Sequence, residues 1–168
     1  RSSFYFGSIL PDIVPSFLTT PHTFGDTFLK FQKRINKYID SYNAEKGMGL
    51  KKSIQLGEIA HYMADYFTFP HNYHFPGNLK QHCHYENQLK FELRAYIKSG
   101  QAQEQNEQIQ IQRTKEELFA SIATQHTMYC SNLSSVQADA RIIVRMCVEV
   151  VASLVYLTSG QTQLALEG

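Results

Sequence analysis

Residues 50–66 read LKKSIQLGEIAHYMADY, and the spacing of their side chains favours one continuous α-helix. One face of this helix carries, at intervals of three and four residues, Leu50, Ile54, Gly57, His61 and Asp65. The stripe starts apolar and ends polar, so the polar pair continues a face that is expected to be buried. Because a buried charge is costly without a partner, we expect His61 and Asp65 to bind one another or an ion.

Another helix is predicted over residues 79–98, and it repeats this arrangement. Its inward face is expected to carry, again at intervals of three and four, His82, Glu86, Leu89, Leu93 and Tyr96. Pro70 ends the earlier helical pattern. Residues 67–78 are rich in Phe, Tyr, His and Pro, so they predict a loop, and this loop carries His71.

Helical patterns also occupy most of the remaining sequence. Thr23 and Asp26 are typical of a helix start, and residues 114–117 form a capping-box pattern that opens another helix. Residues 101–112 are rich in Gln and Glu and predict a loose connection or the start of a polar helix. No alternating run of β-branched residues predicts a strand.

The last predicted helix is the most apolar. Ser134 and Gln137 are its candidate caps, Thr158 lies near its end, and Gly160 is expected to stop it. Its composition predicts the central, most buried helix of a bundle. The fold class predicted for residues 1–168 is therefore all-α, as a single-domain bundle of about five helices.

Composition limits the alternatives. A chain of 168 residues, 43% hydrophobic and 18% charged, corresponds to one globular domain and excludes a disordered tail, a collagen-like fibre and a coiled coil. The net charge of +1 demands no acidic polymer as partner, and no apolar run predicts a transmembrane segment. The start at Arg1 has no signal-peptide pattern, which indicates a removed leader or an absent upstream segment.

Five of the seven histidines lie between positions 61 and 84. In each of the pairs His61/Asp65 and His82/Glu86, an interval of four residues puts both side chains on one helix face, close enough to hold one ion. Imidazole and carboxylate ligands without thiolates suit zinc or another divalent first-row metal. The alternative for a single pair is a structural hydrogen bond, but two inward pairs with His71 between them favour a metal.

The spacing His-x3-Asp-x5-His over residues 61–71, followed by His-x3-Glu over residues 82–86, resembles the zinc-dependent phospholipase C family. The wider superfamily includes single-strand-specific nucleases, and the resemblance covers roughly positions 4 to 160. It implies an all-α fold and an enzyme in which metal-activated water attacks the phosphorus of a phospholipid. It also implies a substrate met at a membrane surface, and secretion.

The resemblance further implies which residues hold zinc. One ion would be held by Asp12, His22, His61 and Asp65, and a second by His71, His82 and Glu86. Asp12 would also act as the catalytic proton acceptor. In the family a third zinc shares the carboxylate that matches Asp65 and uses an N-terminal Trp and a nearby His. This chain has no Trp and no His before His22. We therefore expect an incomplete third site, an absent N-terminal ligand segment and little phosphodiesterase activity.

Two other functions stay open at this point. One is a nuclease, against which stand Glu86, where the nuclease branch usually carries Asp, and the lack of a basic stripe. The other is a metal-binding helical domain without catalysis, which the incomplete third site favours. Of the other candidates, His74 and His84 are expected beside the ligands or on the surface, His126 in a structural role, and Cys83 as a packed thiol.

Overall fold

The computed structural model describes residues 23–43, 46–106, 108–132 and 135–166. In chain order this part contains α2 (Phe24–Asp40), α3 (Leu50–Tyr66), the 3₁₀ turn η2 (Phe69–His71), α4 (Leu79–Lys98), α5 (Gln101–Asn106), α6 (Lys115–Cys130) and α7 (Val136–Leu166). No strand occurs within these ranges. The prediction of an all-α fold is confirmed, and the described residues contain six α-helices where about five were expected for the chain.

Local sequence signals set most of the helix ends. Both α3 and α4 begin and end at the predicted residues. At the start of α6, the Glu117 backbone N–H donates to Thr114 Oγ1 at 3.1 Å, while the Thr114 N–H donates to Glu117 Oε2 at 3.2 Å. The predicted capping box is therefore present. The short helix α5 occupies part of the segment for which a loose connection was one expectation.

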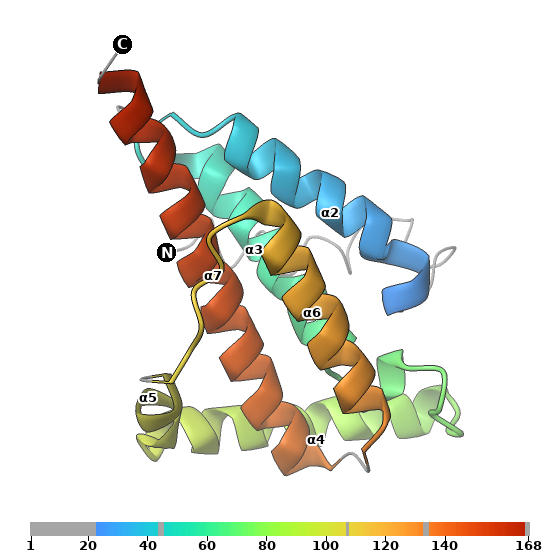
Figure 1. The fold of residues 1–168 in the computed structure, drawn as a ribbon. Helices are drawn as coiled ribbons and strands as arrows, with labels where there is room; N and C mark the ends of the chain where they lie inside the picture. Colours follow the sequence, from blue (N-terminus) through green and yellow to red (C-terminus); the bar gives the residue numbers. More distant parts are fainter. Residues whose placement is uncertain (1–22, 44–45, 107, 133–134, 167–168) are drawn as a thin grey trace.

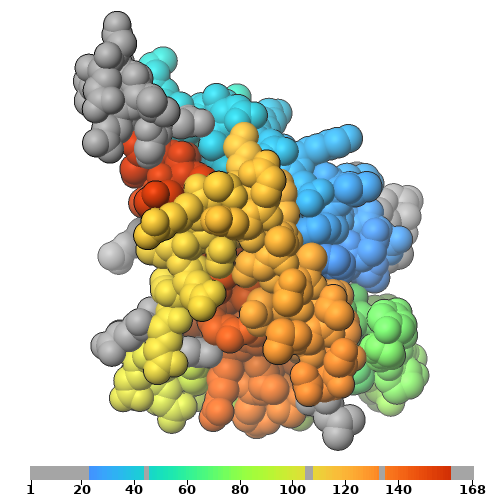
Figure 2. All heavy atoms as spheres, viewed as in Figure 1, coloured from blue at the N-terminus to red at the C-terminus, as the bar shows by residue number. Residues whose placement is uncertain are grey.

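The long helix α7 is the centre of the fold. It contacts each of the other five α-helices of the described chain. In Figure 1, α4 runs across one end of the group formed by α2, α3, α6 and α7. On the face seen in Figure 2, α6 and the segment before it lie in front of α7, so that only parts of α7 are visible. Among the described residues, sixteen buried side chains form the core, and these include Phe31, Ile35, Met63, Ile122 and Met146.

Two details of the predicted helices are wrong. Gly160 does not end the last helix, because α7 continues to Leu166. One glycine inside a helix costs only about 1 kcal/mol relative to alanine, which by itself does not terminate it. Leu50, the first member of the predicted buried stripe, is 71% exposed. It lies in the first turn of α3, beyond the area that the neighbouring helices cover.

The expectation that no segment is apolar enough to cross a membrane is also corrected. Val136–Ser159 of α7 has the length and composition of a membrane span, and an 18-residue window within it has a mean hydropathy of 1.8. The same helix carries two buried carboxylates, Asp139 and Glu149. Glu149 Oε1 accepts hydrogen bonds from Gln112 Nε2 at 3.1 Å and from Ser121 Oγ at 2.9 Å. Buried carboxylates bonded to neighbouring segments, together with contacts to every helix, are typical of a core helix.

Candidate metal centre

The site begins at the C-terminal end of α3. His61 and Asp65 lie one helical turn apart, and His61 Nε2 is 3.0 Å from Asp65 Oδ2. Both side chains are only about one-tenth exposed. The sequence expectation that this pair faces inward therefore agrees with the structure.

The turn after α3 brings the next ligand back over this pair. Thr68 has an extended backbone, and η2 then places His71 against both α3 and α4. His71 Nε2 lies 3.8 Å from Asp65 Oδ1 and 3.1 Å from Glu86 Oε1. His71 is consequently the residue that joins the two polar pairs.

The first two turns of α4 supply the remaining ligands. Asn78 and Gln81 form a capping box that fixes the start of α4 at Leu79, three residues before His82. His82 Nε2 lies 3.0 Å from Glu86 Oε1. The side chain of Glu86 is 45% exposed, against the expectation that it points inward. Glu86 therefore marks the open side of the site, and Asp65 lies on the closed side.

The donor set fits a zinc ion. Within the described ranges, one group of three such side chains, His71, His82 and Glu86, has its ligand atoms within 4.8 Å of one another. Tetrahedral zinc with ligands at about 2.1 Å holds neighbouring ligand atoms about 3.4 Å apart. The contacts of 3.0 and 3.1 Å that join the two imidazole nitrogens to Glu86 Oε1 are close to that spacing. Two imidazoles and a carboxylate, with no sulfur, also have the chemistry that zinc accepts.

The ionisable side chains of the site shift one another's pKa values. Burial alone would lower the pKa of His71, but the hydrogen bond to Glu86 and the charges of Asp65 and Glu86 outweigh it and raise the pKa. The hydrogen bond from His71 lowers the pKa of Glu86 against the effect of burial, and His82 adds to this lowering. A divalent cation that binds here therefore competes with a proton on His71.

Asp139, which was not predicted as a site residue, holds the two segments that carry His71 and Glu86. Asp139 of α7 is fully buried, and its Oδ2 accepts the backbone N–H of Phe69 and the hydroxyl of Tyr85, each at 2.8 Å. Its Oδ1 accepts the hydroxyl of Tyr129 at 2.8 Å. Phe69 lies two residues before His71, and Tyr85 directly precedes Glu86. Asp139 is thus a positioning residue, and its only sequence signal is a carboxylate within an apolar helix.

A second buried contact holds the turn on its other side. Asn72 Nδ2 donates to the carbonyl of Thr68 at 2.9 Å, and Asn72 Oδ1 accepts from His126 Nε2 at 2.9 Å. The His126 ring stacks on Phe24 with centroids 4.0 Å apart, and burial lowers the pKa of His126 to about 4. These contacts agree with the structural role expected for His126.

The predicted ligands are distributed as follows. Five of them, His61, Asp65, His71, His82 and Glu86, lie together at one end of α3 and α4. Asp12 and His22 fall outside the described residues. His74 and His84 are exposed, in agreement with a surface position. Cys83 is also exposed, so the expectation of a packed thiol is wrong, because no helix of the described residues covers its side chain.

Comparison with known proteins adds one result. A model of the family described as zinc dependent phospholipase C matches residues 1–136. Neither a curated protein nor a solved structure matches the chain. The match covers most of the chain and includes every predicted ligand. The chain belongs to the zinc-dependent phospholipase C family.

Proposed function

We propose that the protein hydrolyses the phosphodiester bond of a phospholipid, releasing diacylglycerol and a phosphorylated headgroup. Membership of the family supports a hydrolase of the phospholipase C type that depends on zinc. The observation that carries the proposal further is the convergence of His71, His82 and Glu86, with Asp65 3.8 Å from His71. Such a group, open to solvent on the Glu86 side, can hold a cation where a phosphate can reach it.

The proposal assigns roles to the chain's own residues. His71, His82 and Glu86 hold one zinc ion, while His61 and Asp65, with Asp12 and His22, hold another. Bound zinc supplies positive charge for the phosphoryl oxygens and lowers the pKa of water. Asp12 remains the proposed proton acceptor. Asp65 of the second group contacts His61 at 3.0 Å and also lies 3.8 Å from His71 of the first group.

We further propose that residues 1–168 form a single domain. The family match ends at residue 136, where α7 begins. Yet α7 contacts every other described helix, and its Asp139 bonds the turn before His71. A unit without α7 would lose the centre of its core, so the catalytic unit extends beyond the matched residues.

The test is an assay of the purified chain with zinc on a short-chain choline phospholipid and on single-stranded DNA. The proposal expects slow but measurable release of phosphorylated headgroup, loss of this activity in His82→Ala, and its retention in the matched control His84→Ala. Hydrolysis of DNA without lipid hydrolysis would support the nuclease alternative. Zinc binding by the purified chain with neither activity would support a non-catalytic domain.

A further inference from the structure

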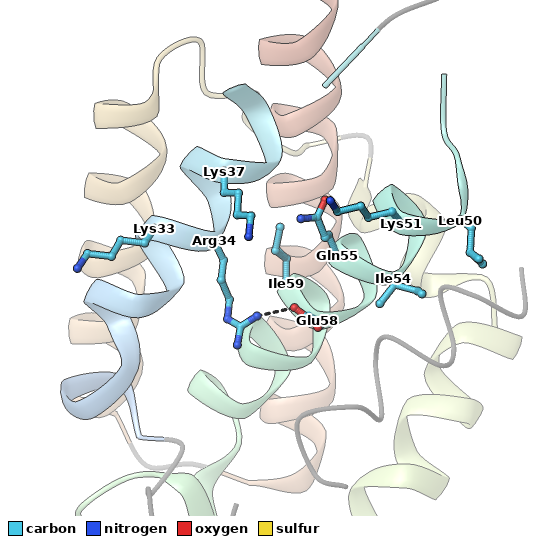
Figure 3. A pocket seen from close by; sticks show the side chains of 9 residues that line it. All are labelled: Lys33, Arg34, Lys37, Leu50, Lys51, Ile54, Gln55, Glu58 and Ile59. Atoms are coloured by element: carbon cyan, nitrogen blue, oxygen red, sulfur yellow. Dashed lines mark hydrogen bonds and ion pairs between the residues drawn. The ribbon is translucent and has the colours of Figure 1, made fainter. Parts of the chain in front are cut away.

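A groove of about 540 Å³ lies between α2 and α3, separate from the candidate metal centre. Its lining includes Lys33, Arg34 and Lys37 from α2 and Lys51, Ile54 and Glu58 from α3. In Figure 3, Lys37 and Lys51 extend toward the space between the two helices, and Lys33 extends from the other side of α2. The walls are therefore mainly basic, over an apolar floor that includes the buried Ile59.

The basic side chains that line this groove outnumber its acidic ones. Arg34 pairs with Glu58, as the dashed line in Figure 3 marks. Among the residues that the structure describes, Lys33, Lys37 and Lys51 form no ion pair. The groove thus keeps a surplus of positive charge, although the whole chain has a formal net charge of only +1. An anionic group bound in the groove would be attracted by all three lysines.

The position of Lys51 has no evident structural purpose. It lies in the first turn of α3, where the helix dipole favours a carboxylate and disfavours a cation. The neighbouring Lys52 is accounted for, because its Nζ donates to the carbonyl of Tyr38 at 2.5 Å and to Ser41 Oγ at 2.8 Å. Lys51 makes no such bond within the described chain. A bound anion would turn this unfavourable position into a favourable one.

Large apolar side chains lie at the edge of the groove. Leu50 is 71% exposed and lines the groove, and Met48, two residues earlier, is 50% exposed. Basic side chains beside exposed apolar ones are the combination that binds the interface of an anionic membrane. We infer that this groove docks the protein on the surface of an anionic phospholipid bilayer. Lys37 and Lys51 bind headgroup phosphates there, and Leu50 enters the edge of the acyl region.

This inference rests on the proposed function, which makes a lipid the substrate. Ile54 and Glu58 of the groove occupy the same helical stripe as His61 and Asp65 of the candidate centre. Seven residues of helix, about 10 Å, separate Ile54 from His61. Docking through the groove therefore holds the candidate centre, which lies further along the same helix, close to the bilayer. The groove itself lies too far away to hold the phosphate that reacts.

The test measures sedimentation of the protein with vesicles of phosphatidylcholine alone and of phosphatidylcholine containing phosphatidylserine. The groove variant is Lys37→Gln with Lys51→Gln, and the matched control is Lys90→Gln with Lys98→Gln on α4, which lowers the net charge equally. We expect preference for the anionic vesicles, binding about 30-fold weaker in the groove variant, and no more than a twofold change in the control. Leu50→Ser is expected to weaken binding as well.

Several outcomes would overturn the inference. These are equal binding to both kinds of vesicle, equal loss in the groove and control variants, or groove-dependent binding of single-stranded DNA without vesicle binding. If millimolar inorganic phosphate releases the protein from anionic vesicles as effectively as an excess of further anionic vesicles does, the groove would be assigned to free phosphate instead. Turnover of a soluble short-chain phospholipid is measured separately and is expected to be unchanged in the groove variant. If neither the wild-type protein nor the variants hydrolyse the short-chain phospholipid, the proposed function is refuted. The sedimentation experiment tests the docking on vesicles independently of that result.

Discussion

The backbone N–H of Phe69 donates a hydrogen bond of 2.8 Å to Asp139 Oδ2, which connects the turn before His71 to the first turn of α7. These residues are 70 positions apart in the sequence. The same oxygen accepts the hydroxyl of Tyr85, which precedes Glu86 on α4. One carboxylate therefore fixes the two segments that supply His71 and Glu86 relative to each other.

Asp139→Asn is expected to lower the free energy of unfolding by about 1–3 kcal/mol, because one acceptor oxygen becomes an amide that faces buried donors. Zinc affinity is expected to fall as well, since the ligand segments lose their common anchor. Chemical denaturation and zinc titration measure the two effects. Asp40→Asn is the matched control: Asp40 is an exposed partner of Lys115, and its loss is expected to cost at most about 1 kcal/mol. Equal effects in the two variants would contradict the anchoring role.

His82→Ala is expected to reduce zinc affinity by roughly 100-fold or more, since even residues that only orient ligands contribute 10- to 100-fold. Glu86 would also lose one of its two imidazole contacts. Competition with a chromogenic chelator gives the affinity. His84→Ala removes an exposed histidine of the same helix and is expected to leave the affinity unchanged. A His82→Ala protein that retains wild-type affinity would show that His82 is not a ligand.

Zinc is expected to raise the melting temperature of the chain. A ligand that binds only the folded state adds about 2.7 kcal/mol at a free concentration of 100 times its Kd. Thermal unfolding with and without zinc measures the shift, and elemental analysis gives the stoichiometry. Magnesium, which prefers oxygen ligands, is the control and is expected to give a much smaller shift. No zinc-dependent shift and no bound metal would contradict a zinc site at these residues.

The buried His126 predicts a pH dependence of stability. Its pKa is about 4 in the folded protein and 6.5 in the reference state, so the unfolded chain takes up the proton first as the pH falls. The contribution of neutral His126 is therefore complete above pH 6.5 and is lost between pH 6.5 and about 4. His126→Gln is expected to be less stable at pH 7 but to lose less stability across this range. Denaturation in metal-free buffer at several pH values checks this, and parallel curves for both proteins would exclude His126 as the cause.

Elements set by neighbours in sequence were predictable. The extents of α3 and α4 follow from apolar spacing and from breakers such as Pro70. The i, i+4 contacts within each helix, both 3.0 Å, follow from helical geometry. The approach of His71 to Glu86 was expected only in outline, because it depends on the path of the intervening turn.

Features set by tertiary packing were not predictable. The bonds to Asp139 join segments 54 and 70 residues apart, and no local pattern encodes them. The exposure of Leu50 depends on where α2 ends relative to α3, which helical periodicity does not specify. The extension of α7 past Gly160 shows the same limit, since a weak local breaker did not end a long helix.

The position of Asp139 near the start of the last helix has a consequence for biosynthesis. The ligand-bearing segments are translated first, but the carboxylate that anchors them leaves the ribosome only afterwards. Until residues 136–166 emerge, Phe69 and Tyr85 lack their acceptor, and the histidines are held only by local structure. The geometry of the centre is thus completed only after α7 has emerged, and a chain stalled before α7 would not assemble it.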